Sequence, residues 1–232
     1  MRRIESFLEG HSAVMDAYDP RRKVGLVLDE WGTWWNPTEG TNPGFLEQQN
    51  ALRDALVASY HFDAFHRHSD RLVMANIAQT INVLQAMLFA DAETGSLVLT
   101  PSYHVFEMNT GHHDARALEV HLLDEAPSYE TERGRVELLS SSASTKDGTA
   151  LISLTNGHQD EPISLRIDLR GAGVRSASGR VLTADRLDAH NTPEQPGAVA
   201  PRELGELSVT GGVLELTLPP ASYTTVSLTL DD

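Results

Sequence analysis

The chain has 232 residues, 40% of them hydrophobic, and carries 18 Lys plus Arg against 33 Asp plus Glu, a formal net charge of −15. This length allows one large domain or two of ordinary size, and the composition is that of a globular protein, not a disordered one. A surface this acidic repels phosphate backbones, which argues against binding to nucleic acid. The sequence has no cysteine, so disulfides and thiolate chemistry are excluded.

We expect neither a targeting segment nor a membrane span. The first residues, MRRIESFLEGH, contain two arginines but lack the apolar stretch of a secretory signal. No apolar run reaches the roughly 20 residues that a membrane helix needs. These features predict a cytoplasmic protein that does not associate with a membrane.

Helices and strands alternate in the first half of the chain, which is typical of parallel α/β units. Asp19-Pro20 is expected to end the first helix, and Thr100-Pro101 to begin the last. Asn42-Pro43 predicts the start of another helix in the same way. In chain order, the expected elements are a helix over about 4–19, a strand over 23–29, a helix from Asn42 to about His66, a strand over 71–79 and a helix over 101–109.

The second half changes to the period of two that is typical of strands buried on one face. Apolar residues alternate with Ser, Thr and charged residues at 163–169, 214–218 and 226–230. The pattern predicts an antiparallel sandwich, with the change from the first half near residues 111–117. The serine-rich stretch SSSAST at 140–145 is expected to be a surface loop.

The two strands of the first half have apolar residues on both faces, as in RLVMANIAQ at 71–79. Such strands need neighbouring strands on each side and helices outside them. The chain supplies only the helices closest to them. We therefore predict that the first half is part of a larger sheet, either as a fragment of a longer protein or together with a partner chain.

The first strand runs into VLDEWGTWWNP, a motif with two carboxylates. Asp29 and Glu30 are adjacent on the strand, so their side chains are expected on opposite faces and cannot act as a pair on one substrate. The second strand ends with the amides of Asn76 and Gln79, which can bind sugar hydroxyls but cannot donate a catalytic proton. A complete pair of catalytic carboxylates is therefore absent from the sequence pattern.

The tryptophans of this motif allow two interpretations. Trp31, Trp34 and Trp35 can form a wall on which the apolar face of a sugar ring stacks. They can equally belong to the core, where each would bury roughly 150–250 Å². The residues alone leave both interpretations open.

The histidines give no sign of a metal site. His66 and His68 are two apart on a predicted helix, and His112-His113 is a pair at a helix end. Neither pair has a carboxylate or third histidine at ligand spacing. We expect both pairs to have a plain surface role.

Several long motifs then identify a resemblance. VGLVLDEWGTWW is followed by GTNPGFLEQQNALRDALVAS, MANIAQTINVLQAM and LTPSYHVFEMN, and later by ISLRIDLRG and GRVLTADRLDAHNT. In this order they resemble glycoside hydrolase family 51, the α-L-arabinofuranosidases, over essentially the whole chain. The resemblance implies an α/β part followed by an all-β part: the remnant of a (β/α)8 barrel, strands 7 and 8 with their helices, over 1–115, and an antiparallel jelly-roll-like β-sandwich over 116–232.

The same resemblance implies a retaining mechanism and roles for particular residues. Glu30, at the end of the seventh barrel strand, matches the nucleophile. Gln79, at the end of the eighth, matches a glutamine that hydrogen-bonds the arabinose, and Trp34 matches an aromatic residue of the sugar pocket. Asp29 is given a structural role only. No metal and no cofactor is implied.

The chain departs from the family because it lacks a counterpart to the acid/base glutamate and to barrel strands one to six. We expect the C-terminal portion of an enzyme that hydrolyses terminal non-reducing α-L-arabinofuranosyl residues of arabinan, arabinoxylan and their oligosaccharides. The chain alone is expected to be inactive, because no acid protonates the leaving oxygen. Its expected partners are arabinofuranosyl oligosaccharides and the missing N-terminal barrel part, and the full-length enzyme is expected to form homo-oligomers.

A function of another class is also open. The chain can be a non-catalytic module, in which the sandwich contacts carbohydrate or assembles subunits. Sugar binding without turnover would favour the module. Turnover restored by adding the missing N-terminal part would favour the enzyme.

Overall fold

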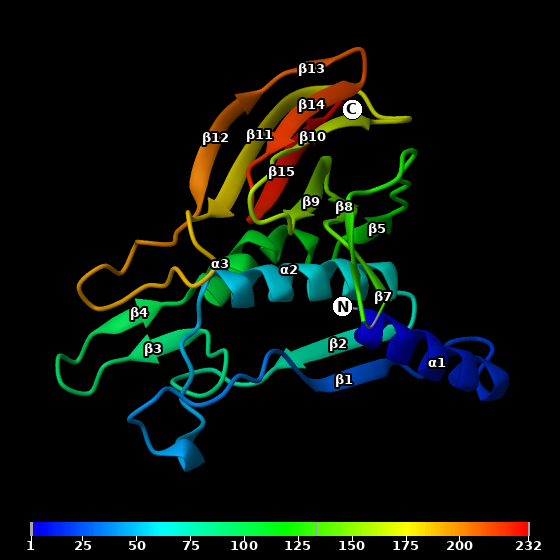
Figure 1. Cartoon of the computed structure of the whole chain (residues 1–232). Coiled ribbons are helices and arrows are strands. Elements are labelled where there is room, and N and C mark those ends of the chain that lie inside the picture. Colours follow the sequence, from blue (N-terminus) through cyan, green and yellow to red (C-terminus); the bar gives the residue numbers. More distant parts are fainter. Residues whose placement is uncertain (1, 133, 232) are drawn as a thin grey trace.

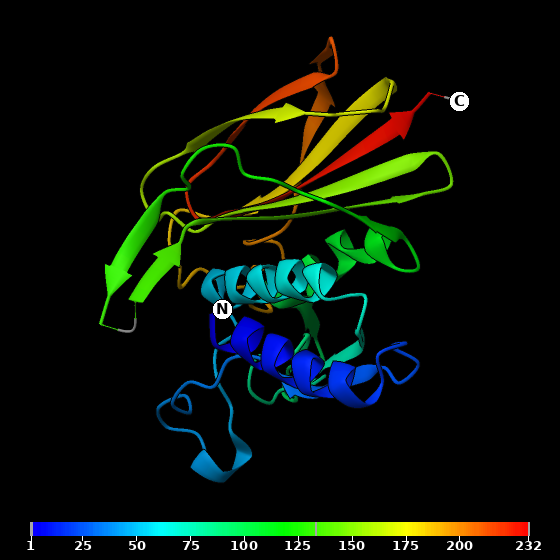
Figure 2. The same ribbon diagram turned by 90° about the vertical axis from the view of Figure 1, so that its right-hand side faces the viewer.

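The computed structural model describes residues 2–132 and 134–231, which are arranged in stacked layers. A β-sandwich lies on one side of helices α2 and α3, and the parallel pair β1–β2 lies on the other side (Figure 1). Helix α1 lies beside α2, as the rotated view shows (Figure 2). The elements are α1 (Arg2–Tyr18), β1 (Leu26–Trp31), η1 (Pro43–Phe45), α2 (Leu52–Arg67), β2 (Leu72–Ile77), β3 (Leu88–Ala90), β4 (Leu97–Leu99), α3 (Pro101–Met108), η2 (Thr110–His112), β5 (Arg116–Leu118), β6 (Ser128–Thr131), β7 (Gly134–Glu137), β8 (Leu139–Lys146), β9 (Thr149–Asn156), β10 (Ile163–Asp168), β11 (Val174–Thr183), β12 (Arg202–Leu207), β13 (Val209–Thr210), β14 (Val213–Leu218) and β15 (Ser222–Leu230).

The sandwich consists of a six-stranded sheet, in the order β12-β11-β15-β9-β8-β5, and a three-stranded sheet, in the order β10-β14-β13. All of these pairs are antiparallel. The two sheets enclose an apolar core that includes Ile152, Leu214, Leu218 and Val226. Leu214 and Leu218 come from one of the alternating runs, and both are completely buried. The antiparallel sandwich predicted from this alternation is confirmed.

Strand β8 corrects the expectation that residues 140–145 form a surface loop. The stretch pairs with β9 along its whole length and with β5 at one end. Its side chains alternate, because Ala143 packs in the sandwich core whereas Ser142 and Ser144 bond to side chains of the helical layer. Serine is typical of loops, but here those partners satisfy hydroxyl groups that would otherwise be costly to bury.

Helix α2 begins well after Asn42, where the sequence predicted its start. Asn42 does cap a turn, but that turn is the short helix Pro43–Phe45, which ends where Leu46 takes a left-handed conformation with φ 53°. The α-helix begins instead next to Asp54, whose carboxylate accepts a hydrogen bond from the backbone N–H of Ala51 (2.9 Å). A capping signal in the sequence therefore marked a separate turn.

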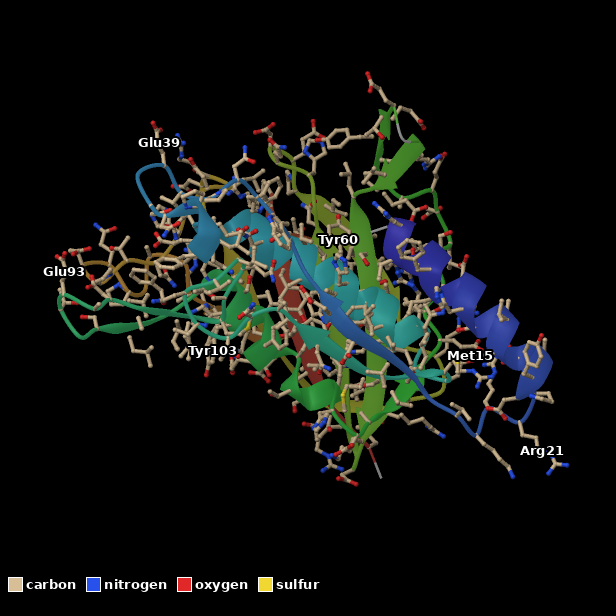
Figure 3. The ribbon with its side chains drawn as sticks, turned by 90° about the horizontal axis from the view of Figure 1, so that it is seen from below. Met15, Arg21, Glu39, Tyr60, Glu93 and Tyr103 are labelled. Atoms are coloured by element: carbon tan, nitrogen blue, oxygen red, sulfur yellow. The ribbon has the colours of Figure 1, made fainter. Side chains whose placement is uncertain are left out.

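The parallel pair β1–β2 lies under α2. Seen from below, it crosses in front of α2, with the loop of Glu39 and the hairpin of Glu93 toward one side and Met15 of α1 toward the other (Figure 3). The side of the pair that faces α2 belongs to an apolar cluster around Trp31, which also includes Tyr223 of β15. This cluster therefore joins the strands, the helices and the sandwich in one core.

The other side of β1–β2 is uncovered. Val27 of β1 and Met74 of β2, which are paired with each other, are 44% and 54% exposed. Neither strand has a further partner strand among the described residues. Strands with apolar residues on both faces were expected to belong to a larger sheet, and that larger sheet stays a prediction.

Arg71 fixes α1 to the start of β2. Its buried guanidinium pairs with Asp16 and with Asp19 (3.0 Å to Asp19), and it donates to the carbonyl oxygen of Val24 (2.8 Å). Hydrogen bonds from Arg22 and then from Arg71 lower the pKa of Asp16 to about 2. The helix that precedes β1 is thereby tied to the strand that follows α2.

Buried polar side chains join α2 to the sandwich. Ser142 of β8 donates to the carboxylate of Asp63 on α2 (2.8 Å), and its oxygen lies 2.8 Å from Nδ1 of His66. The ring of His66 lies 4.3 Å from the ring of His112, whose Nδ1 is 2.8 Å from the hydroxyl of Ser144. The helix therefore contacts this face of the sheet through hydroxyl groups and imidazoles.

The same network continues to β15. Nε2 of His112 lies 2.8 Å from the hydroxyl of Ser153, which lies 3.0 Å from the hydroxyl of Tyr223. The Tyr223 oxygen also accepts a hydrogen bond from the side chain of Asn109 (2.6 Å). Tyr223 is completely buried, so the network crosses the interior and not the surface.

The expected surface role is therefore wrong for His66 and His112, although His113 is exposed. Burial lowers the pKa of His66 to about 4 and that of His112 to about 3. Asp63 is also completely buried, and burial raises its pKa to about 7. Neutral imidazoles can be buried here because nearby hydroxyl groups replace water as their partners.

We predict that Asp63→Asn and His66→Gln change the pH dependence of stability in opposite directions. The raised pKa of Asp63 means that wild-type stability falls as pH rises from 3.8 to about 7. The Asn variant does not titrate, so its free energy of unfolding should gain roughly 2 kcal/mol on wild type between pH 5 and pH 8. The lowered pKa of His66 makes wild-type stability fall as pH drops below 6.5, so the Gln variant should gain on wild type at pH 5.

Urea unfolding of the three proteins at both pH values measures these differences. The quantity compared is the change, from pH 5 to pH 8, in the free energy of unfolding of each variant relative to wild type. A change of the same sign for the two variants, or no change with pH, would contradict the assignment of these groups as buried and titrating.

Candidate functional site

The carboxyl end of β1 presents two exposed carboxylates, Asp29 and Glu30. Leu28 and Trp31 both belong to the core under α2, and the pairing with β2 shifts register between them. This irregularity interrupts the alternation from which opposite faces were expected for the two carboxylates. Asp29 accepts a hydrogen bond from the side chain of Asn76 (3.3 Å). Within the described residues, the Glu30 carboxylate has no hydrogen bond or ion pair, so it is open to a ligand.

Gln79 follows β2 at the same end of the parallel pair. Ile77 is paired with Trp31, and the backbone N–H of Ala78 donates to the carbonyl oxygen of Trp31 (3.2 Å). The structure therefore brings Gln79 beside the segment that carries Glu30. Gln79 is exposed and lines an open hollow of about 510 Å³. The other lining residues are Gly44, Phe45, Leu46, Glu47, Asn82 and Val83.

The three tryptophans have different environments. Trp31 is 6% exposed, and its ring stacks against His61 and Phe106, with centroid distances of 5.2 and 5.9 Å. Trp34 is 65% exposed and Trp35 is 41% exposed. Trp31 is therefore part of the core, whereas Trp34 and Trp35 are available to a ligand.

Asp54 holds the loop that follows Glu30. It is buried in the first turn of α2, and its Oδ1 accepts hydrogen bonds from the hydroxyl of Thr33 (2.7 Å) and from the indole N–H of Trp35 (2.7 Å). Its Oδ2 accepts the backbone N–H of Ala51 (2.9 Å). Sequence reasoning missed Asp54, because it placed this residue inside a helix expected to begin earlier. A carboxylate in a first helical turn is the signal that could have found it.

Two glutamines and an arginine complete the support of this loop. Gln48 accepts the backbone N–H of Trp35 (2.8 Å), and the guanidinium of Arg53 lies 4.6 Å from the centre of the Trp35 ring. Gly32 has φ 139°, and a side chain at this position would meet Gln85 at 2.4 Å. The loop therefore requires glycine at position 32, immediately before Thr33.

The chemistry offered at this end of β1–β2 is that of a carboxylate, amides and aromatic faces. A carboxylate can act as a nucleophile, an amide can bond to hydroxyl groups, and an exposed indole can stack on an apolar ring face. Among residues 2–132 and 134–231, no group of three or more His, Asp or Glu is placed to hold a metal ion. A carboxylate, amides and exposed indoles together suit a neutral ligand that carries hydroxyl groups.

The chain matches one protein-family model over most of its length. Residues 29–222 match the family model described as the alpha-L-arabinofuranosidase C-terminal domain. The chain belongs to this family. The matched range begins at Asp29 and so includes Glu30, Trp34 and Gln79.

Curated relatives are arabinofuranosidases, and the chain matches only part of each. An intracellular exo-alpha-L-arabinofuranosidase of Bacteroides ovatus is 43% identical over 97% of this chain and 43% of its own length. An intracellular exo-alpha-(1->5)-L-arabinofuranosidase of Streptomyces lividans is 25% identical over 96% of this chain and 36% of its own length. The chain thus spans less than half the length of these relatives. In the part of the chain that the structure describes, no helix is both long and apolar enough for a membrane span.

Solved structures agree with the family. A GH51 arabinofuranosidase from Xanthomonas axonopodis pv. citri superposes with a TM-score of 0.91 at 44% identity, covering 97% of this chain and 45% of that protein. The arabinose complex of an alpha-L-arabinofuranosidase from Thermotoga maritima superposes with a TM-score of 0.80 at 23% identity, which shows a shared fold. The resemblance to family 51 is confirmed, while the roles of Glu30, Gln79 and Trp34 stay predictions.

We predict that removing Trp31 and removing Trp34 affect stability very differently. Trp31→Ala should lower the free energy of unfolding by about 3–5 kcal/mol, because it leaves a cavity between buried rings. Trp34→Ala should change it by no more than about 0.5 kcal/mol, because the side chain is mostly exposed. Urea unfolding followed by far-ultraviolet circular dichroism measures both changes. Similar losses for the two variants would show that Trp34 is a core residue.

Proposed function

We propose that the chain is the C-terminal portion of an intracellular, retaining exo-α-L-arabinofuranosidase. The proposed substrates are terminal non-reducing α-L-arabinofuranosyl residues of arabinan, arabinoxylan and derived oligosaccharides, in line with the names of the relatives. The observation that carries the proposal is that Glu30 and Gln79 lie at one end of β1–β2, and that the loop directly after Glu30 carries the exposed Trp34. Catalytic residues of barrel enzymes lie at the carboxyl ends of parallel strands.

Glu30 is the proposed nucleophile. Its carboxylate attacks the anomeric carbon, and the bond from that carbon to the leaving oxygen breaks as the glycosyl-enzyme forms. Water then attacks the same carbon, returns Glu30 as a carboxylate and releases arabinose with retained configuration. In this proposal, the Gln79 amide bonds to hydroxyl groups of the sugar, and Trp34 packs against its ring.

The proposed proton donor lies outside this chain. A general acid has to protonate the departing oxygen of an unactivated glycoside. Asp29 already accepts a hydrogen bond from Asn76, and it receives no catalytic role. The relatives carry more than half of their length beyond the part that this chain matches, and we place the acid there. In this proposal, strands of that portion pair with the outer edges of β1 and β2 and complete a barrel with residues 1–115. The uncovered face of the pair then becomes the interior of the barrel, and residues 116–232 form the sandwich domain.

We predict that turnover requires both the N-terminal portion and Glu30. The measurements are release of arabinose from arabinan oligosaccharides, and release of 4-nitrophenol from 4-nitrophenyl α-L-arabinofuranoside. The chain alone should show no turnover of arabinan oligosaccharides, because it lacks the acid. Co-expression with the N-terminal portion of the Bacteroides ovatus relative should give turnover, and Glu30→Gln should abolish it. Asp29→Asn is the matched control, because it neutralises the neighbouring exposed carboxylate and should keep turnover.

Azide distinguishes a nucleophile from a residue needed for folding. In Glu30→Gly, azide should attack the anomeric carbon, displace 4-nitrophenolate and give the glycosyl azide of inverted configuration. Retention of full activity in Glu30→Gln would overturn the assignment. Arabinose binding by the combined protein without any turnover would favour the non-catalytic module instead.

A further inference from the structure

The two residues that flank Trp34 share one hydrogen-bond acceptor. The hydroxyl of Thr33 and the indole N–H of Trp35 both donate to Oδ1 of Asp54, each at 2.7 Å. Trp34 lies between them in the sequence and is itself exposed. A single buried oxygen therefore holds the side chains on both sides of the residue that is proposed to meet the sugar.

Asp54 can hold the loop in place because it belongs to helix α2, which is buried. Its second oxygen accepts the backbone N–H of Ala51 at 2.9 Å, so the same carboxylate forms part of the start of α2. Helix α2 is buried between the sandwich and β1–β2, and Leu52 and Ala55, on either side of Asp54, are completely buried. The loop after Glu30 is therefore attached to the interior and not to another loop.

The hydrogen bonds between Asp54 and the loop are also costly to break. Asp54 is completely buried at its side chain, so losing its donors leaves an acceptor without water. Arg53 packs on the outer side of Trp35, which restricts the ring further. A loop held by these contacts does not have to be ordered when a ligand binds.

We propose that Asp54 is a positioning residue for the sugar site: through Thr33 and Trp35 it holds Trp34 in place beside Glu30 before the arabinofuranosyl ring enters. This inference rests on the proposed function, because the ligand of Trp34 is taken from it. Asp54 contacts no reacting atom in this proposal. It acts only through the two loop residues that it binds.

The test begins with the order of the loop, which needs no sugar. In the ¹⁵N-labelled chain, heteronuclear NOE values of residues 32–35 should equal those of α2 in the wild type. They should fall in Asp54→Asn and in the double variant Thr33→Val/Trp35→Phe. The double variant is decisive, because it leaves the bond between Asp54 and Ala51 intact and so keeps the start of α2. Asp63→Asn is the matched control, because it changes a completely buried aspartate on the same helix away from this loop.

The second readout is the indole resonance of Trp34 during titration with methyl α-L-arabinofuranoside, assigned through the single Trp→Phe variants. Loss of about 1.4 kcal/mol of preorganisation would make the double variant require about tenfold more sugar than the wild type or Asp63→Asn. An equally rigid loop in the double variant, or an unchanged midpoint, would overturn the positioning role. A Trp34 resonance that does not respond in the wild type would instead count against the proposed function, and the loop measurement would still decide the role of Asp54.

Discussion

Burial of helix α2 on two opposite sides is the constraint on which the rest of the structure depends. One side packs on β1–β2 through the aromatic cluster around Trp31, and the other packs on the six-stranded sheet. Because both sides are occupied, α2 cannot shift relative to either layer without breaking one interface. Its first turn then supplies Asp54, which holds the loop after Glu30. The position of the candidate site relative to the sandwich is therefore set by this helix.

The two sides of α2 are held by different interactions, apolar packing on one side and hydrogen bonds on the other. The side toward β1–β2 is apolar, and rings around Trp31 lie 5.1–5.9 Å apart, so its stability comes from burial and ring packing. Toward the sheet, Asp63 and His66 meet the hydroxyl of Ser142. Hydrogen bonds of this kind add little net free energy, but each is lost if the helix moves by one residue. The polar side therefore fixes the register in which the helix docks, and the apolar side provides most of the attraction.

The sequence predicted those features that depend on neighbours along the chain. Alternation over 214–218 predicted a one-sided strand, and Thr100-Pro101 predicted the start of α3, because both signals are local. The serine-rich strand at 140–145 and the buried His112 were missed because their partners lie far away in sequence. The same reason hid Asp54, whose two loop donors come from the turn before η1. The motif resemblance pointed to Glu30, Gln79 and Trp34, whereas the contacts that support their segments are long-range and appear only in the fold.

The proposed site is divided between two portions of sequence, and this places a demand on each portion. A retaining enzyme needs its two carboxyl groups about 5–5.5 Å apart, so a nucleophile free to move would meet the acid only part of the time. Catalytic groups have to be held within about 0.5 Å by their own supporting contacts. In this chain, the register shift in β1, the glycine at position 32 and the Asp54 carboxylate act on the residues on both sides of Glu30. Under the proposed function, these contacts are this chain's contribution to the alignment of the nucleophile, and the other portion has to bring the acid to it.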